Sequence, residues 1–84
     1  MGENNLFNPK DFMYIDESYP IDTNLPEHLL DYIDELEEYY KKDDWIGFDC
    51  LLEGVEGTIK SFYINRLITE KQLDILFRRY GIRW

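Results

Sequence analysis

Large apolar residues recur at steps of three and four along one stretch of the chain: Trp45, Phe48, Leu52, Val55, Ile59 and Phe62. This spacing keeps them on one face of an α-helix, which turns about once every 3.6 residues. No segment alternates convincingly between apolar and polar residues, as a half-buried strand would. The sequence therefore predicts an all-α protein with its main helix over residues 44–64. Gly54 and Gly57 each cost roughly 1 kcal/mol there relative to alanine, so a break at EGVEG is the alternative.

A second helix is predicted over residues 26–42. Its apolar face recurs at the same helical spacing and consists of Leu29, Ile33, Leu36 and Tyr40. At its start, Asn24 and Glu27 have the spacing of a capping box. Pro26 fits the first turn, because its missing N–H has no partner there in any helix.

A third helix is predicted over residues 70–80. Thr69 and Gln72 have capping-box spacing, and Gly81 suits a left-handed C-cap. Because the connections between the helices are short, neighbouring helices should be antiparallel. The predicted fold is a small antiparallel three-helix bundle over residues 25–84. Its largely buried residues should include Leu36, Phe48, Leu52, Val55, Ile59, Leu73 and Phe77.

Residues 1–24 are predicted to form an N-terminal arm that packs across the bundle. This segment has no steady period and contains Pro9 and Pro20. It also holds six large apolar residues that would be costly to leave in water: Phe7, Phe12, Met13, Tyr14, Ile15 and Tyr19. We therefore expect only residues 1–5 to be free of the bundle.

The composition favours a folded protein of the cytoplasm. The 84 residues are enough for one domain, and 17% aromatic residues supply buried area in spite of the net charge of −9. Cys50 is the one cysteine, so no intrachain disulfide can form and a reducing compartment fits. We expect neither a signal peptide nor a membrane helix, because no apolar run of the necessary length is present.

Five carboxylates are predicted to share one face of helix 26–42, within an arc of about 100° opposite the apolar face: Glu27, Asp31, Asp34, Glu35 and Glu38. Like charges at i, i+4 each cost a few tenths of a kcal/mol. Only Glu37 with Lys41 and Glu38 with Lys42 have spacing that would offset this. The face is interpreted as a solvated surface, as a binding surface for a basic partner, or, third, as a metal site. For the second reading, we expect its carboxylates to be exposed and unpaired.

Charge is distributed unevenly along the chain. Residues 1–58 hold 16 acids and 3 bases, whereas residues 59–84 hold 2 acids and 6 bases. Lys71, Arg78 and Arg79 are expected together on the outer face of helix 70–80. They are explained either by solvation and compensation of the helix dipole or by a contact with phosphate or carboxylate.

A stripe of small residues is predicted on helix 44–64, roughly opposite its main apolar face: Cys50, Gly54, Gly57 and Ser61. Glycine in a helix often permits a close approach by another group. The stripe is therefore a candidate either for helix packing within the chain or for an interface of a homodimer.

No residues with a catalytic, cofactor-binding or metal-binding pattern are found. His28 and Cys50 are the only histidine and cysteine, and a positive imidazolium is disfavoured in the first turn of a helix. One histidine cannot supply the two Glu-x-x-His motifs of a di-iron bundle, and no phosphate-binding loop or zinc motif occurs. The sequence predicts no enzyme and no cofactor.

The sequence favours a small acidic protein-interaction module. Its five-carboxylate face would bind a basic protein surface, in the sharpest version as a nucleic-acid mimic that inhibits a nuclease or a defence protein. Direct binding to nucleic acid or to a membrane is not expected at this net charge. The alternative is a structural or regulatory subunit that self-associates through the small-residue stripe.

Overall fold

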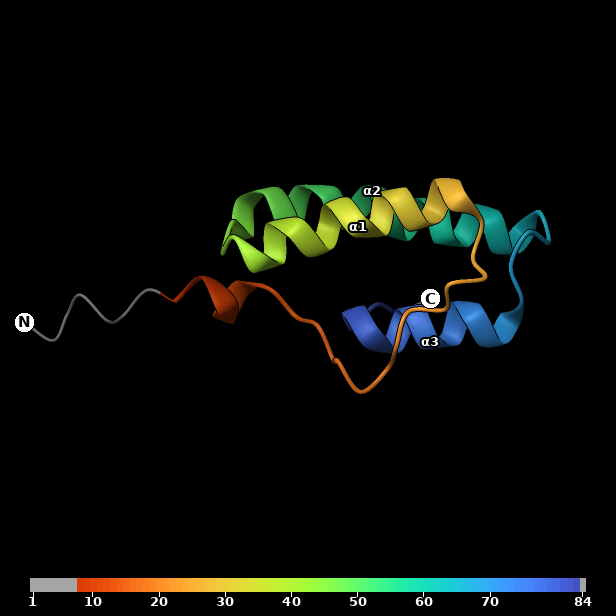
Figure 1. Cartoon of the computed structure of the whole chain (residues 1–84), viewed down its shortest axis with the longest axis horizontal. Coiled ribbons are helices and arrows are strands. Elements are labelled where there is room, and N and C mark those ends of the chain that lie inside the picture. Colours follow the sequence, from red (N-terminus) through yellow and green to blue (C-terminus); the bar gives the residue numbers. More distant parts are fainter. Residues whose placement is uncertain (1–7, 84) are drawn as a thin grey trace, which may run out of the picture.

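The computed structural model describes residues 8–83, which form three α-helices and one short 3-10 helix and contain no strand (Figure 1). The elements are η2 (Pro9–Phe12), α1 (Glu27–Lys41), α2 (Trp45–Ile64) and α3 (Glu70–Tyr80). The helices pack against one another as a small three-helix bundle, which confirms the predicted fold class. Each helix boundary lies within one residue of the prediction. The expectation that residues 1–5 are free lies outside the described residues.

Helices α1 and α2 form an antiparallel hairpin, and α3 runs antiparallel to α2 beneath it (Figure 1). The core between them is apolar and buried: Leu29, Ile33, Leu36, Phe48, Val55, Ile59, Ile68, Leu76, Phe77 and Tyr80. Five of the seven predicted core residues are confirmed. Leu52 and Leu73 are only half-buried. On α2 the side chains of Phe48, Val55 and Ile59 point into the core. Leu51 and Leu52 lie on either side of this line and are therefore only partly covered.

Two of the three helices begin with a side-chain cap, and the one at the start of α3 is the capping box that the sequence predicted. Thr69 Oγ1 accepts from the Gln72 backbone N–H at 3.1 Å, and Gln72 Oε1 accepts from the Thr69 N–H at 2.8 Å. Asp44 caps α2 by accepting from the Gly47 N–H at 3.0 Å. The predicted capping box of α1 is wrong. Pro26 itself is the N-cap and has no side-chain acceptor, so the helix begins too late for the Asn24 side chain to reach its first turn.

All three helices end in the same way, with one residue in the left-handed conformation: Asp43 (φ 58°), Arg66 (φ 62°) and Gly81 (φ 66°). After each, a backbone N–H donates back across the last turn: Asp44 to Tyr39 O, Leu67 to Phe62 O and Ile82 to Phe77 O. This motif normally uses glycine, because a side chain at positive φ is strained. It turns the chain sharply enough for short connections between α1 and α2 and between α2 and α3.

Two tyrosines of α1 pack directly against glycines of α2: Tyr39 against Gly47 and Tyr32 against Gly54. A Cβ on Gly47 would meet the Tyr39 ring at 2.6 Å, and a Cβ on Gly54 would overlap the Tyr32 hydroxyl. The tyrosines and the glycines are both seven residues apart, as an antiparallel pair of helices requires. Helix α2 is continuous through both Gly54 and Gly57, which confirms the predicted single helix and rules out the alternative of a break at EGVEG.

The described part of the arm, residues 8–24, contacts the bundle along its length. This part starts beside the α1–α2 turn, passes α3 and enters α1 at the far end (Figure 1). Lys10 Nζ lies 3.0 Å from Asp43 Oδ1 and 3.7 Å from the centre of the Tyr40 ring. Further along, Met13 and Leu25 are buried in the core. The described part of the arm therefore packs across the helices.

Candidate functional site

The five carboxylates of the predicted binding face are all exposed on α1: Glu27, Asp31, Asp34, Glu35 and Glu38. They point away from the buried line of Leu29, Ile33 and Leu36. Among the described residues, the one ion pair of this face joins Glu38 Oε2 to Lys41 Nζ at 3.9 Å, which contradicts the expectation that Glu38 is unpaired. We call these five residues the acidic face.

A shallow depression opens beside the acidic face, with a volume of about 460 Å³. It is lined by His28, Asp31, Tyr32 and Glu35. The His28 ring stacks on Phe62 of α2, with ring centres 6.2 Å apart, and meets the edge of Tyr32 at 6.4 Å. Two carboxylates thus stand at the mouth of a hollow with aromatic rings in its wall. We call it the aromatic depression.

Its wall depends on the packing of α1 on α2. Tyr32 lies over Gly54, where the absence of a side chain leaves room for the tyrosine hydroxyl. His28 extends the wall through its contact with Phe62, which is half-buried. Aromatic faces carry negative charge density and attract cations, and the neighbouring carboxylates add to that attraction. The arrangement is chemically suited to a planar cationic group.

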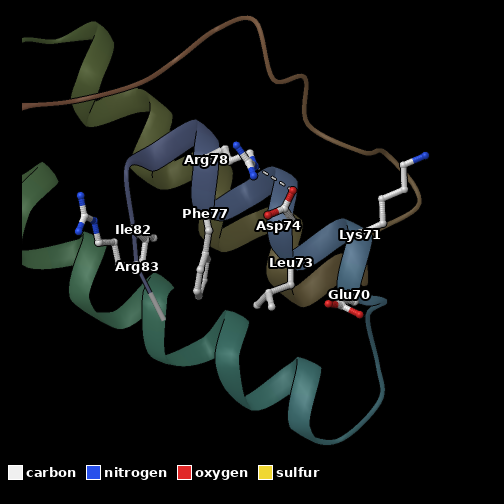
Figure 2. Close-up of a pocket in the computed structure, with 8 residues that line it drawn as sticks. All are labelled: Glu70, Lys71, Leu73, Asp74, Phe77, Arg78, Ile82 and Arg83. Carbon is white, nitrogen blue, oxygen red and sulfur yellow. Dashed lines mark hydrogen bonds and ion pairs between the residues drawn. The ribbon is translucent and has the colours of Figure 1, made fainter.

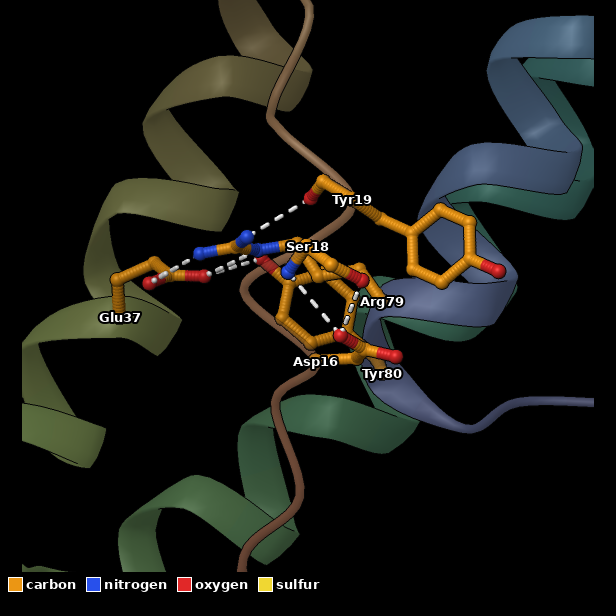
Figure 3. Close-up of polar contacts among 6 residues, drawn as sticks. All are labelled: Asp16, Ser18, Tyr19, Glu37, Arg79 and Tyr80. Atoms are coloured by element: carbon orange, nitrogen blue, oxygen red, sulfur yellow. Dashed lines mark hydrogen bonds and ion pairs between the residues drawn. The ribbon is translucent and has the colours of Figure 1, made fainter.

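Glu37 is the α1 carboxylate that the fold uses (Figure 3). The Arg79 guanidinium donates to both oxygens of Glu37 at 3.1 Å and to the Tyr19 carbonyl at 2.8 Å. The Tyr80 hydroxyl donates to Glu37 Oε2 at 2.6 Å. Arg79 is only 8% exposed, so its predicted place on the outer face of α3 is wrong. The predicted Glu37–Lys41 pair does not form because Glu37 faces α3.

This network ties α1, α3 and the arm together. Burial, with the hydrogen bond to Glu37 and its charge, raises the pKa of the Tyr80 phenol far above its ordinary value, so Tyr80 remains a neutral donor. In the arm, hydrogen bonds from the Ser18 hydroxyl and N–H lower the pKa of the Asp16 carboxyl. Asp16 N–H also donates to the Arg79 carbonyl at 2.7 Å. The cluster therefore stabilises the packing of the bundle.

The small-residue stripe divides into two parts. Gly54 packs against Tyr32 within the chain. Cys50, Gly57 and Ser61 are exposed, and a Cβ on Gly57 would meet nothing within 4 Å. Part of the stripe therefore serves the α1–α2 contact and part faces outward.

A larger open groove of about 820 Å³ runs along α3 (Figure 2). Its apolar lining is formed by Leu73, Phe77 and Ile82, and the residues around them include Lys71, Arg78 and Arg83. Figure 2 shows Leu73 and Phe77 projecting from the same side of α3 toward α2. We call it the α3 groove.

Within residues 8–83, no group of three or more histidine, cysteine or acidic side chains is arranged to hold a metal ion. No helix in the described part of the chain is long and apolar enough to cross a membrane. Comparisons of the chain with models of protein families, with curated proteins and with solved structures found no match.

Proposed function

We propose that this protein is a small acidic interaction module whose acidic face binds a basic surface on another protein. The observation that carries the proposal is the aromatic depression, where Asp31 and Glu35 stand beside the rings of His28 and Tyr32. Neither carboxylate has an ion pair within the described residues. A face that served solvation alone would need neither the hollow nor an excess of one sign of charge.

An arginine of the partner is the best occupant of the aromatic depression. Its guanidinium is flat and can stack on an aromatic ring while donating two parallel hydrogen bonds to a carboxylate. A lysine ammonium provides a point charge without this geometry. An arginine held in such a pocket is typical of the few residues that dominate binding energy at an interface. The remaining carboxylates, Glu27, Asp34 and Glu38, would surround it with complementary charge.

In the sharpest form of the proposal, the partner surface normally holds nucleic acid and the protein inhibits a nuclease or a defence protein by mimicking the phosphates. The net charge of −9 supports this version, because it attracts basic surfaces at long range and speeds their association. The free, exposed Cys50 is compatible with a reducing cytoplasm as the place of action.

The test compares charge reversal on the acidic face with the same reversal elsewhere. Asp34→Lys with Glu38→Lys alters the face, and Asp49→Lys with Glu53→Lys makes the identical charge change on exposed positions of α2. A partner captured from lysate by the wild-type protein should bind the first variant much more weakly and the second nearly as well. The difference should shrink at high salt, because screening acts on exposed charges. Equal binding by both variants would leave the acidic face as a solvated surface.

Self-association through α2 is the second candidate. The outward part of the small-residue stripe lies between two exposed isoleucines, Ile46 (59% exposed) and Ile64 (67% exposed). A second copy could cover all of these together. Sedimentation at increasing protein concentration tests this, with Gly57→Leu expected to abolish a dimer and leave the monomer folded.

A further inference from the structure

We propose that the α3 groove is a second binding site, which takes an amphipathic acidic helix of another protein. The site is separate from the acidic face and does not depend on the function proposed for that face. Its accessible apolar lining comes from Leu73 of α3 and from Ile82 just beyond the helix, whereas Phe77 between them is only 7% exposed. Leu73 and Ile82 are half-buried, so part of each side chain is covered by the bundle and part is left in the groove.

The backbone makes the groove concave. Gly81 adopts the left-handed conformation at φ 66°, and the Ile82 N–H donates to the Phe77 carbonyl at 2.8 Å. This turn directs the chain away from the axis of α3, so that Ile82 lies beside Phe77 and Arg83 follows (Figure 2). The groove is therefore bounded by a helix face on one side and by the C-terminal segment on the other.

The charges around the groove favour an acidic occupant. Three of the chain's nine basic residues line it, although the chain has twice as many acids as bases. Arg78 and Asp74 pair with each other at 2.9 Å and are both more than half exposed, so their charges largely cancel. Lys71 and Arg83 have no ion pair within residues 8–83, and Figure 2 shows them toward opposite ends of the groove. The negative charge of Glu70 is offset in part by the positive end of the helix dipole, because Glu70 lies in the first turn of α3.

The shape favours a helix over a small molecule or a nucleic acid. Small-molecule sites usually enclose most of the ligand surface, whereas this groove is open along its length. The accessible apolar surface runs from Leu73 on α3 to Ile82 beyond its end, over the buried Phe77, and an elongated apolar strip with charges beside it suits one face of a docked amphipathic helix. A polyanion would meet Glu70 and Asp74 at the rim and would gain nothing from the apolar lining. The acidic face of a second copy lacks the apolar side chains needed to fill it.

A synthetic helical peptide with leucines at i, i+4 and i+7 and glutamates on both flanks is the probe. It should bind the full chain, measured by calorimetry, and should shift the backbone amide NMR signals of residues 70–83. A peptide with serines for the leucines and one with lysines for the glutamates should each bind at least several-fold more weakly. Lys71→Glu with Arg83→Glu should weaken binding roughly tenfold, since each exposed ion pair contributes up to about a fivefold change in affinity.

The matched control is Lys41→Glu with Lys42→Glu, the same change in charge at exposed positions near the α1–α2 turn. It should bind the peptide almost as the wild type does. The proposal is overturned if the two double variants bind alike, if the serine peptide binds as well as the leucine peptide, or if a single-stranded oligonucleotide of equal charge displaces it. Reversing Asp34 and Glu38 should leave peptide binding unimpaired, which separates this site from the acidic face.

Discussion

Replacing the glycines of α2 one at a time tests the packing of α1 on α2. Gly57→Ala should stabilise the protein, because its Cβ would meet nothing within 4 Å and alanine is favoured over glycine in a helix by about 1 kcal/mol. In a domain of this size that corresponds to a rise in Tm of about 4–8 °C. The measurement is thermal unfolding followed by circular dichroism.

Gly54→Ala should not give this gain. Its Cβ would overlap the Tyr32 hydroxyl and would lie 3.3 Å from the ring carbon that carries it. The ring must shift, and overpacking of this kind costs about 1–3 kcal/mol. After the helix gain of about 1 kcal/mol, the net effect should range from about zero to a loss of 2 kcal/mol.

The Tyr32→Phe background identifies the hydroxyl as the cause. Without that oxygen the nearest atom of residue 32 lies at 3.3 Å, a tight contact that a small movement relieves. Gly54→Ala should therefore stabilise the Tyr32→Phe protein relative to Tyr32→Phe alone. If Gly54→Ala raises the Tm as much as Gly57→Ala, or if the hydroxyl makes no difference, then Tyr32 does not pack on Gly54 and the aromatic depression loses its wall.

Further expectations concern the core, the turns and the network around Arg79. Ile33→Ala, at a fully buried position, should cost about 2–5 kcal/mol in denaturant unfolding, and Leu52→Ala, at a half-buried one, clearly less. Arg66→Gly should stabilise by roughly 0.5–1 kcal/mol, because glycine relieves the strain of the left-handed turn at φ 62°; a loss of stability would contradict that geometry. Arg79→Ala should cost about 2–4 kcal/mol by leaving Glu37 without its cation, and Glu37→Gln with Arg79→Met should be less harmful than Arg79→Ala. Folding lowers the pKa of Asp16 from its ordinary value of 3.8, so the stability that its carboxylate contributes is present above that pH and is lost as the pH falls through the lowered pKa. Asp16→Asn should therefore lose less stability than the wild type when the pH is lowered from neutral to well below 3.8 in denaturant unfolding.

Local signals in the sequence predicted most of the fold. The Thr69–Gln72 capping box and the left-handed Gly81 are contained within a few residues, so neighbours in space cannot easily override them. The Asn24 cap was wrong because Pro26 took the capping position and moved the start of α1. The burial of Leu52 was overestimated, because the helical period of α2 defines an apolar face but does not determine which part of that face the other helices contact.

Contacts between residues far apart in the chain could not be predicted from the sequence. Arg79 and Glu37 are 42 residues apart, and nothing local joins them. A helical wheel does place Arg79 about 60° from Leu76 and about 100° from Arg78, so its position at the border of the apolar face could have been recognised. The aromatic depression could not be predicted without the register of α1 on α2. The packing of Tyr32 on Gly54 and of Tyr39 on Gly47 sets that register, and it brings Phe62 next to His28.

The six acidic residues of α1 divide by what they contribute to folding. Glu37 accepts three hydrogen bonds from α3 and is largely buried, so the bundle depends on it. The acidic face comprises the other five, which are exposed and make one long ion pair among the described residues. Their i, i+4 repulsion opposes the helix by a few tenths of a kcal/mol per pair. Reversal of Asp34 and Glu38 to lysine should therefore leave the Tm within a few degrees of the wild type while it weakens binding to a basic partner. A collapse of the fold on reversal would mean that these carboxylates serve the bundle, and the argument for a binding face would lose its basis.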